Sequence, residues 1–168
     1  MTQIVWIQII VTIAILCIAL AEALVLQYRK PGSFDWSEAW LSLADMAGRR
    51  LLGVLPVGIA TPVFEWVWTH RLFTIELNGF AAFLLLFLGL EFFYYWYHRA
   101  SHRVRFFWAT HAVHHSPNQL TLSTSFRLGW TNKLTGITLF YTPLVYFGFE
   151  PKIVLTALSL NLLYQFWL

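Results

Sequence analysis

The chain has 168 residues, of which 58% are apolar, 18% aromatic and only 11% charged, and its mean hydropathy is +0.61. Soluble domains carry about 25% charged residues, so this composition excludes an ordinary water-soluble domain and makes lipid the expected solvent for much of the chain. The net charge of +3 is too small to indicate nucleic-acid binding, and the single cysteine, Cys17, excludes an internal disulfide.

The first predicted element is a membrane helix over residues 4–26, which are almost uninterruptedly apolar. A helix of this length crosses about 30 Å of hydrocarbon. A signal peptide would need a basic n-region, but the first 28 residues contain no Lys or Arg. We therefore expect a transmembrane helix or membrane-inserted anchor.

Residues 27–50 form a polar break, in which Asp35 is placed to cap a short interfacial helix. Residues 51–69 are apolar again but contain Pro56, Gly58 and Pro62, which predict a kinked span or a re-entrant segment. Residues 1–78 are therefore predicted to be an N-terminal membrane anchor followed by a kinked second membrane segment.

Residues 79–97 give the clearest later span. Residues 98–133 are polar and basic, and residues 134–168 are apolar with a break at 149–152, which predicts a helical hairpin with two arms of about 16 residues. The fold class expected from these elements is all-α, an integral-membrane helical bundle with a histidine cluster at its cytoplasmic face.

The basic residues predict the orientation of these spans. They gather in residues 29–50 and 98–133, whereas the loop at 70–78 holds only Arg71. The positive-inside rule then gives three crossings before His98 and places the histidines in the cytoplasm. The short N-terminus favours a bacterial inner membrane over the endoplasmic reticulum.

Five of the six histidines fall within 18 residues: His98, His102, His111, His114 and His115. Spacings of three and four residues place side chains on one face of a helix, so each group should present its imidazoles together. His70 stands alone and is predicted to be an interfacial residue. A solvated basic face would rarely show both helical spacings beside a membrane.

Imidazole binds Fe, Zn, Cu and Ni well, and no cysteine lies nearby to complete a thiolate zinc site. Two groups of histidines offer more ligands than a single tetrahedral ion needs, so two metal ions are predicted. Glu91 and Tyr95 lie on nearly the same helical stripe as His98. Glu91 is about 10 Å along the helix from His98, which favours a supporting role over metal ligation.

The runs at 91–102 and 107–116, EFFYYWYHRASH and FWATHAVHHS, resemble the histidine boxes of the fatty acid hydroxylase/sterol desaturase superfamily. The resemblance covers about residues 80–168 and is nearest to the branch of bacterial sterol-desaturase-like proteins and alkylglycerol monooxygenase. It identifies residues 79–168 as a fatty acid hydroxylase-like domain. The family has a third histidine box downstream of a segment like 164–168, so this domain is expected to be truncated before that box.

The resemblance implies a membrane-bound non-haem di-iron oxygenase that hydroxylates or desaturates a lipid, whether fatty acyl, sterol or ether lipid, with O₂. It implies that all five clustered histidines are iron ligands and that electrons come from an external electron-transfer protein. The residues expected to support the ligands are Glu91, Tyr95, Asn118 and Arg127.

Two alternatives remain. A bis-histidine haem protein needs histidines inside facing spans, whereas these cluster where a span ends. A non-catalytic metal-binding or metal-transporting membrane protein would usually place ionisable residues within its spans. Glu22, Glu65 and Glu91 are the candidates for such a path.

Overall fold

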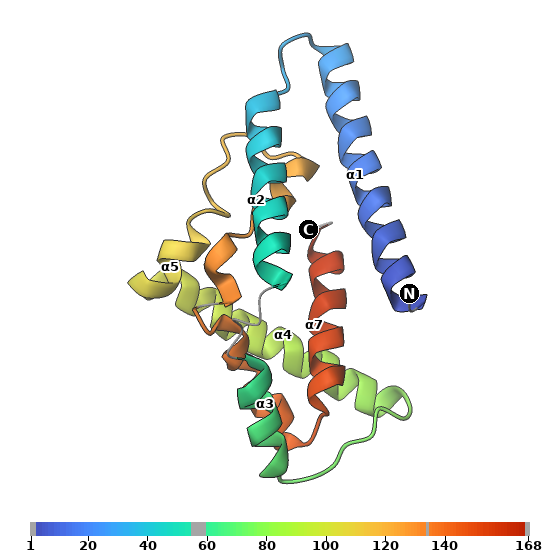
Figure 1. The fold of residues 1–168 in the computed structure, drawn as a ribbon, viewed down its shortest axis with the longest axis vertical. Coiled ribbons are helices and arrows are strands. Elements are labelled where there is room, and N and C mark those ends of the chain that lie inside the picture. Colours follow the sequence, from blue (N-terminus) through green and yellow to red (C-terminus); the bar gives the residue numbers. More distant parts are fainter. Residues whose placement is uncertain (1–2, 55–59, 134, 167–168) are drawn as a thin grey trace.

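The computed structural model describes residues 3–54, 60–133 and 135–166, and all regular elements within these ranges are helical (Figure 1). The predicted all-α class is therefore confirmed. The α-helices are α1 (Gln3–Arg29), α2 (Trp36–Val54), α3 (Ala60–Thr69), α4 (Phe80–Arg103), α5 (Arg105–His111), α6 (Thr142–Phe147) and α7 (Pro151–Gln165). Three short 3₁₀ helices follow α5, namely η1 (Leu122–Phe126), η2 (Trp130–Lys133) and η3 (Ile137–Tyr141).

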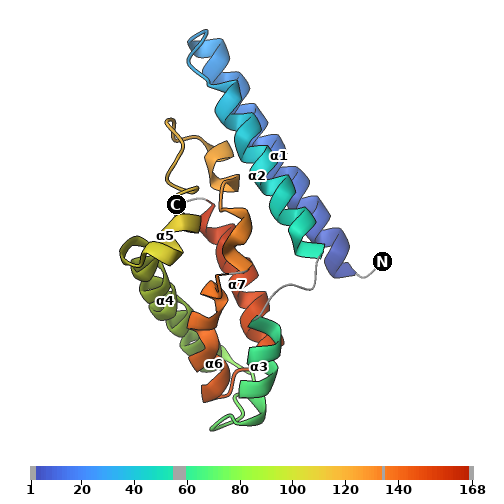
Figure 2. The same cartoon turned by 60° about the vertical axis from the view of Figure 1, so that its left-hand side comes forward.

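Helices α1 and α2 form an antiparallel hairpin, seen at the top of both ribbon views (Figures 1 and 2). The predicted cap is present, because Asp35 Oδ1 accepts the backbone N–H groups of Ser37 (2.9 Å) and Glu38 (3.2 Å). The predicted short interfacial helix is wrong in length. Residues 36–54 contain no proline, so α2 continues for 19 residues.

Two helices of the described residues, Ile9–Arg29 of α1 and Phe80–Arg103 of α4, are long and apolar enough to cross a membrane. The predicted kink at Pro56 and Gly58 lies outside the described residues. The ten residues of α3 span only about 15 Å, so α3 alone does not cross a bilayer. Because residues 55–59 of the predicted second segment lie outside the described residues, the three crossings before His98 stay a prediction, as does the side that the histidines face.

The main core lies where α3, α4, η3, α6 and α7 meet. Its buried side chains are Phe64, Val67, Leu86, Leu90, Tyr141, Leu144, Val145, Phe149 and Val154. The predicted turn near 149–152 is present between α6 and α7, but the first arm of the hairpin is not one long helix. Gly136 adopts a left-handed conformation and Pro143 begins a new helical turn, so this arm divides into η3 and the six-residue α6.

A polar ladder joins α4 to α7 in this apolar region. Glu91 Oε1 accepts a hydrogen bond from Asn161 Nδ2, and Asn161 Oδ1 accepts one from Gln165 Nε2, each at 2.5 Å. Polar side chains that bond across helices hold apolar helices in register, because hydrocarbon offers them no other partner. Glu91 therefore has a partner on α7.

The turn after α6 predicts a measurable stability difference between two glycines. Gly148 has φ +123°, and a Cβ there would lie 2.5 Å from the Phe73 carbonyl oxygen, whereas Gly32 has φ +80° and open space around it. Gly148→Ala combines backbone strain with a collision and should destabilise the protein by about 2 kcal/mol or more, against about 1 kcal/mol for Gly32→Ala. Thermal unfolding of both variants in detergent measures this; equal losses would show that the contact with Phe73 is loose.

Candidate metal centre

The first pair of histidines is carried by α4, which continues past Tyr97 to Arg103 as predicted. His98 and His102 are one turn apart, with ring centroids 4.8 Å from each other. Val104 is extended (φ −102°, ψ 117°) and separates α4 from α5. This break reverses the chain, so that α5 returns its last residue, His111, to the same two imidazoles.

The second group of histidines is not fully helical, which corrects the prediction. Helix α5 ends at His111, and His114 and His115 lie in successive turns closed by His114 N–H to His111 O (3.0 Å) and His115 N–H to Ala112 O (3.1 Å). Ser116 Oγ then bonds back to the Val113 carbonyl (2.8 Å), ahead of the proline that prevents a longer helix. The tighter turns still place His115 beside His111.

Four imidazoles converge on one point. Their Nε2 atoms are 3.0 Å apart for His98 and His102, 3.3 Å for His102 and His111, and 3.2 Å for His111 and His115. All four ligand atoms lie within 4.8 Å of one another. Ligands about 2.0–2.1 Å from one ion have neighbours about 2.9–3.4 Å apart, so the donor set fits a metal ion.

The chemistry of the facing nitrogens supports the same fit. In a neutral imidazole one ring nitrogen carries a proton and the other a lone pair, so facing nitrogens cannot all be paired with one another. A central cation would accept all four lone pairs. Among the described residues this group holds histidines alone, with no carboxylate or thiolate, which makes its ligands neutral.

Burial keeps His111, the one buried ring of the four, in the form that binds metals. His111 is only 7% exposed. Burial, and then the neighbouring histidines, lower the pKa of His111 to about 3. Burial, followed by His114 and His102, also lowers the pKa of His115. Because metals bind the deprotonated nitrogen, a lowered pKa leaves the site ready for a cation at neutral pH.

Tyrosine and tryptophan side chains border the cluster. The Tyr94 hydroxyl lies 3.3 Å from His98 Nδ1, one helical turn earlier. The Tyr95 hydroxyl, predicted to support the ligands, accepts a hydrogen bond from Arg99 at 3.0 Å. Trp108 stacks on His115 with ring centroids 5.8 Å apart. The four-residue spacing between Tyr94 and His98 was the sequence signal for this contact.

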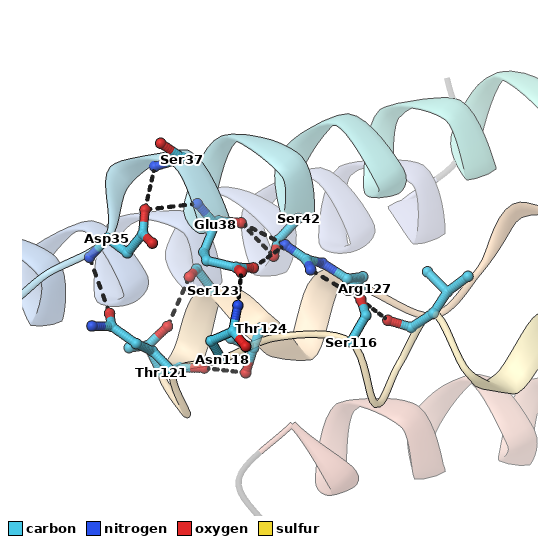
Figure 3. Close-up of polar contacts among 12 residues, drawn as sticks. Asp35, Ser37, Glu38, Ser42, Ser116, Asn118, Thr121, Ser123, Thr124 and Arg127 are labelled. Carbon is cyan, nitrogen blue, oxygen red and sulfur yellow. Dashed lines mark hydrogen bonds and ion pairs between the residues drawn. The ribbon is translucent and has the colours of Figure 1, made fainter.

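Arg127 and Asn118, both predicted to support the site, meet at Glu38 of α2 (Figure 3). Arg127 forms an ion pair with Glu38 Oε2 at 2.7 Å, and Asn118 donates to Glu38 Oε1 at 3.0 Å. Both partners of the ion pair are nearly buried, with side chains 7% and 12% exposed. The Arg127 backbone oxygen accepts a hydrogen bond from His114 Nδ1 at 3.1 Å, so this network ends on the one clustered histidine outside the group of four.

Sequence reasoning missed that three acids of the N-terminal hairpin bind the segment after the histidines. Glu22 Oε2 accepts the Leu122 N–H at 2.6 Å, and Asp45 Oδ2 accepts those of Leu128 (3.0 Å) and Gly129 (3.2 Å). Glu38 is the third. The sequence did carry a signal for these contacts. Acidic residues occur in a region with few charges, and Glu38 and Asp45 are seven residues apart, which places them on one face of a helix.

Glu91 is placed away from the four converging nitrogens, with its carboxylate on Asn161. It lines an open, mainly apolar groove of about 300 Å³ together with Tyr94, Tyr95, His98 and Arg99. Its lining residues lie on one face of α4 and include the first histidine of the cluster.

Comparison with known proteins gives concordant matches. Residues 83–168 match the family model described as fatty acid hydroxylase. The chain is 32% identical to the alkylglycerol monooxygenase of Homo sapiens over 157 residues, which are 93% of this chain and 34% of that protein. It is 34% identical to the alkylglycerol monooxygenase of Xenopus tropicalis, over 76% of this chain and 28% of that protein. It is also 34% identical to that of Danio rerio, over 71% of this chain and 26% of that protein. The chain thus spans about a third or less of the length of these relatives. No solved structure matches it.

The lowered pKa of His111 predicts acid sensitivity of the metal-free protein. Unfolded His111 takes up a proton near pH 6.5, whereas the folded one resists protonation down to about pH 3. The unfolded state therefore binds more protons in this window, and stability should fall as pH decreases through it. His111→Asn should reduce the slope of thermal stability against pH between 6.5 and 4, with part of the slope left because the pKa of His115 is lowered too; His70→Asn, outside the cluster, is the control. An unchanged slope in His111→Asn would contradict this.

Proposed function

The chain belongs to the fatty acid hydroxylase family, and we propose that it forms part of a membrane-bound non-haem di-iron oxygenase that hydroxylates or desaturates a lipid with O₂. The observation that carries this proposal is the convergence of four imidazole ligand atoms within 4.8 Å. Imidazole ligands leave coordination positions open, which O₂ chemistry at iron requires. When bound, the iron ions would supply the oxygen activation.

An ether lipid is the substrate class that the comparisons favour. The three relatives named alkylglycerol monooxygenase align with 71% to 93% of this chain, including both histidine groups. The apolar groove on α4 suits an alkyl chain, because His98 is among its lining residues and the outer side chains of the helix are apolar. A lipid bound there keeps its body in hydrocarbon and brings one carbon to the histidines.

Each residue of the site has a proposed role. His98, His102, His111 and His115 hold one ion, and His114 is the candidate donor to a second. Tyr94 fixes the ring of His98 through Nδ1. Trp108 stacks on His115 and shields that face of the ring from water. The exposed cations around the end of α4, Arg99, Arg103 and Arg105, form a surface on which an acidic electron-transfer protein would dock.

The proposed location is an integral-membrane one with the histidines on the cytoplasmic side, in a bacterial inner membrane. It rests on the two apolar helices and on the gathering of basic residues around the cluster. A metal-binding or metal-transporting protein without turnover is the second candidate. The observation in its favour is that four neutral histidines also suit a zinc ion.

The decisive experiment combines metal analysis with isotope labelling. The protein, purified from membranes in detergent, should contain iron. With ¹⁸O₂, a reductant and an alkylglycerol, it should yield a lipid product that carries ¹⁸O or a new double bond. Zinc in place of iron, with no oxygen-dependent product from any lipid, would support the metal-handling alternative and contradict the oxygenase.

Single substitutions test the ligand assignment. His98→Ala and His114→Ala should each lose metal and oxygen-dependent product by at least about 100-fold while the protein still inserts into the membrane. His70→Ala is the matched control, because His70 bonds to the Trp66 carbonyl at the end of α3 and lies outside the cluster. Full activity in either cluster variant would refute that residue as a ligand.

A further inference from the structure

We infer that Asp45 of α2 is a positioning residue that sets the orientation and tautomer of His114 through the Arg127–Leu128 peptide group. The inference deepens the proposed function and rests on it, because a fixed imidazole matters only if His114 donates to a metal. A continuous path of hydrogen bonds connects the nearly buried carboxylate of Asp45 to the ring of His114.

The path ends on a hydrogen bond whose direction is fixed by chemistry. His114 Nδ1 lies 3.1 Å from the Arg127 carbonyl oxygen, and a carbonyl oxygen has no proton to give. Nδ1 must therefore be the donor. In the neutral ring this leaves Nε2 with its lone pair, which is the form that binds a metal ion.

The same peptide group is held from its other side by Asp45. Leu128 N–H, bonded to the Arg127 carbonyl carbon, donates to Asp45 Oδ2 at 3.0 Å. A peptide group is planar, so fixing the direction of its N–H also fixes the direction of its C=O. The two bonds reinforce each other, because an N–H that donates to a carboxylate makes the opposite carbonyl oxygen a better acceptor. Asp45 thus acts on His114 without touching it.

The carboxylate is well placed to hold this peptide group firmly. Asp45 is 8% exposed, and the same oxygen also accepts the Gly129 N–H at 3.2 Å. Charge-assisted bonds of this kind are about twice as strong as neutral ones. On the far side, Gly129 has φ +82° and approaches α5 so closely that a Cβ would lie 2.9 Å from the Thr110 carbonyl oxygen. The peptide is therefore confined between α2 and the residue that precedes His111.

Glu38 and Asp45, the two acids of α2 that bind this segment, bind different groups. Glu38 binds the Arg127 guanidinium and the Asn118 amide, which are side chains (Figure 3). Glu22 of α1 provides a closer comparison with Asp45. Its carboxylate accepts the Leu122 backbone N–H at 2.6 Å, in the same segment but in a peptide group that makes no bond to a histidine. Glu22→Ala is therefore a matched control for Asp45→Ala.

The test measures Fe(II) binding to the purified, metal-depleted protein under anaerobic conditions. Loss of a partner that orients a ligand costs about 10- to 100-fold in metal affinity, so Asp45→Ala should raise the dissociation constant by that factor. Glu22→Ala should stay within about threefold of the unsubstituted protein. Asp45→Asn retains an amide oxygen that can accept both N–H groups and should restore most of the affinity. Equal losses in Asp45→Ala and Glu22→Ala would overturn the inference.

A second measurement needs no substitution at Asp45. In ¹⁵N-histidine-labelled, metal-free protein, the His114 signals can be identified by their absence in His114→Gln. For the neutral ring they should report a proton on Nδ1 and none on Nε2. A proton on Nε2 would overturn the inference even if Asp45→Ala failed to fold. Failure of the proposed function would give a different result. His98→Ala would then keep its bound metal, while the His114 signals would still report a proton on Nδ1.

Discussion

The convergence of four imidazole nitrogens is the constraint on which the rest of this structure depends. His98 and His102 come from one helix, and His111 and His115 come from the end of the next helix and the turn after it. Helix α4 must therefore end just after His102, and Val104 ends it by adopting an extended conformation. Without that break one continuous helix would place His98 and His111 about 20 Å apart along its axis.

A second requirement follows from the segment after the histidines, whose regular structure among the described residues is limited to the short 3₁₀ helices η1 and η2. Its backbone N–H groups would be costly to leave unpaired near an apolar protein interior. Carboxylates from α1 and α2 supply acceptors, and the backbone donors in turn offset the cost of placing acids where charge is scarce. The N-terminal hairpin, which precedes the residues matched by the family model, therefore holds this segment in place, and Asp45 of α2 binds the peptide group whose carbonyl accepts from His114.

Much of this architecture could be predicted from local patterns. Helical spacing placed His98 and His102 on one face of a continuing span, and the capping role of Asp35 followed from residue type alone. Other features depend on tertiary packing that the sequence does not encode locally. The end of α5 at His111 was missed because turns and a helix give similar spacings over five residues. The pairing of Glu38 with Arg127 joins residues 89 positions apart, which no periodicity reveals.

We propose that the histidine cluster holds iron. X-ray absorption at the iron edge, recorded on protein purified anaerobically from membranes, tests this most directly. The account predicts iron whose nearest shell is dominated by imidazole nitrogen, and loss of that signal in His102→Ala. Protein that binds no iron, or binds it with a shell lacking imidazole, would contradict it.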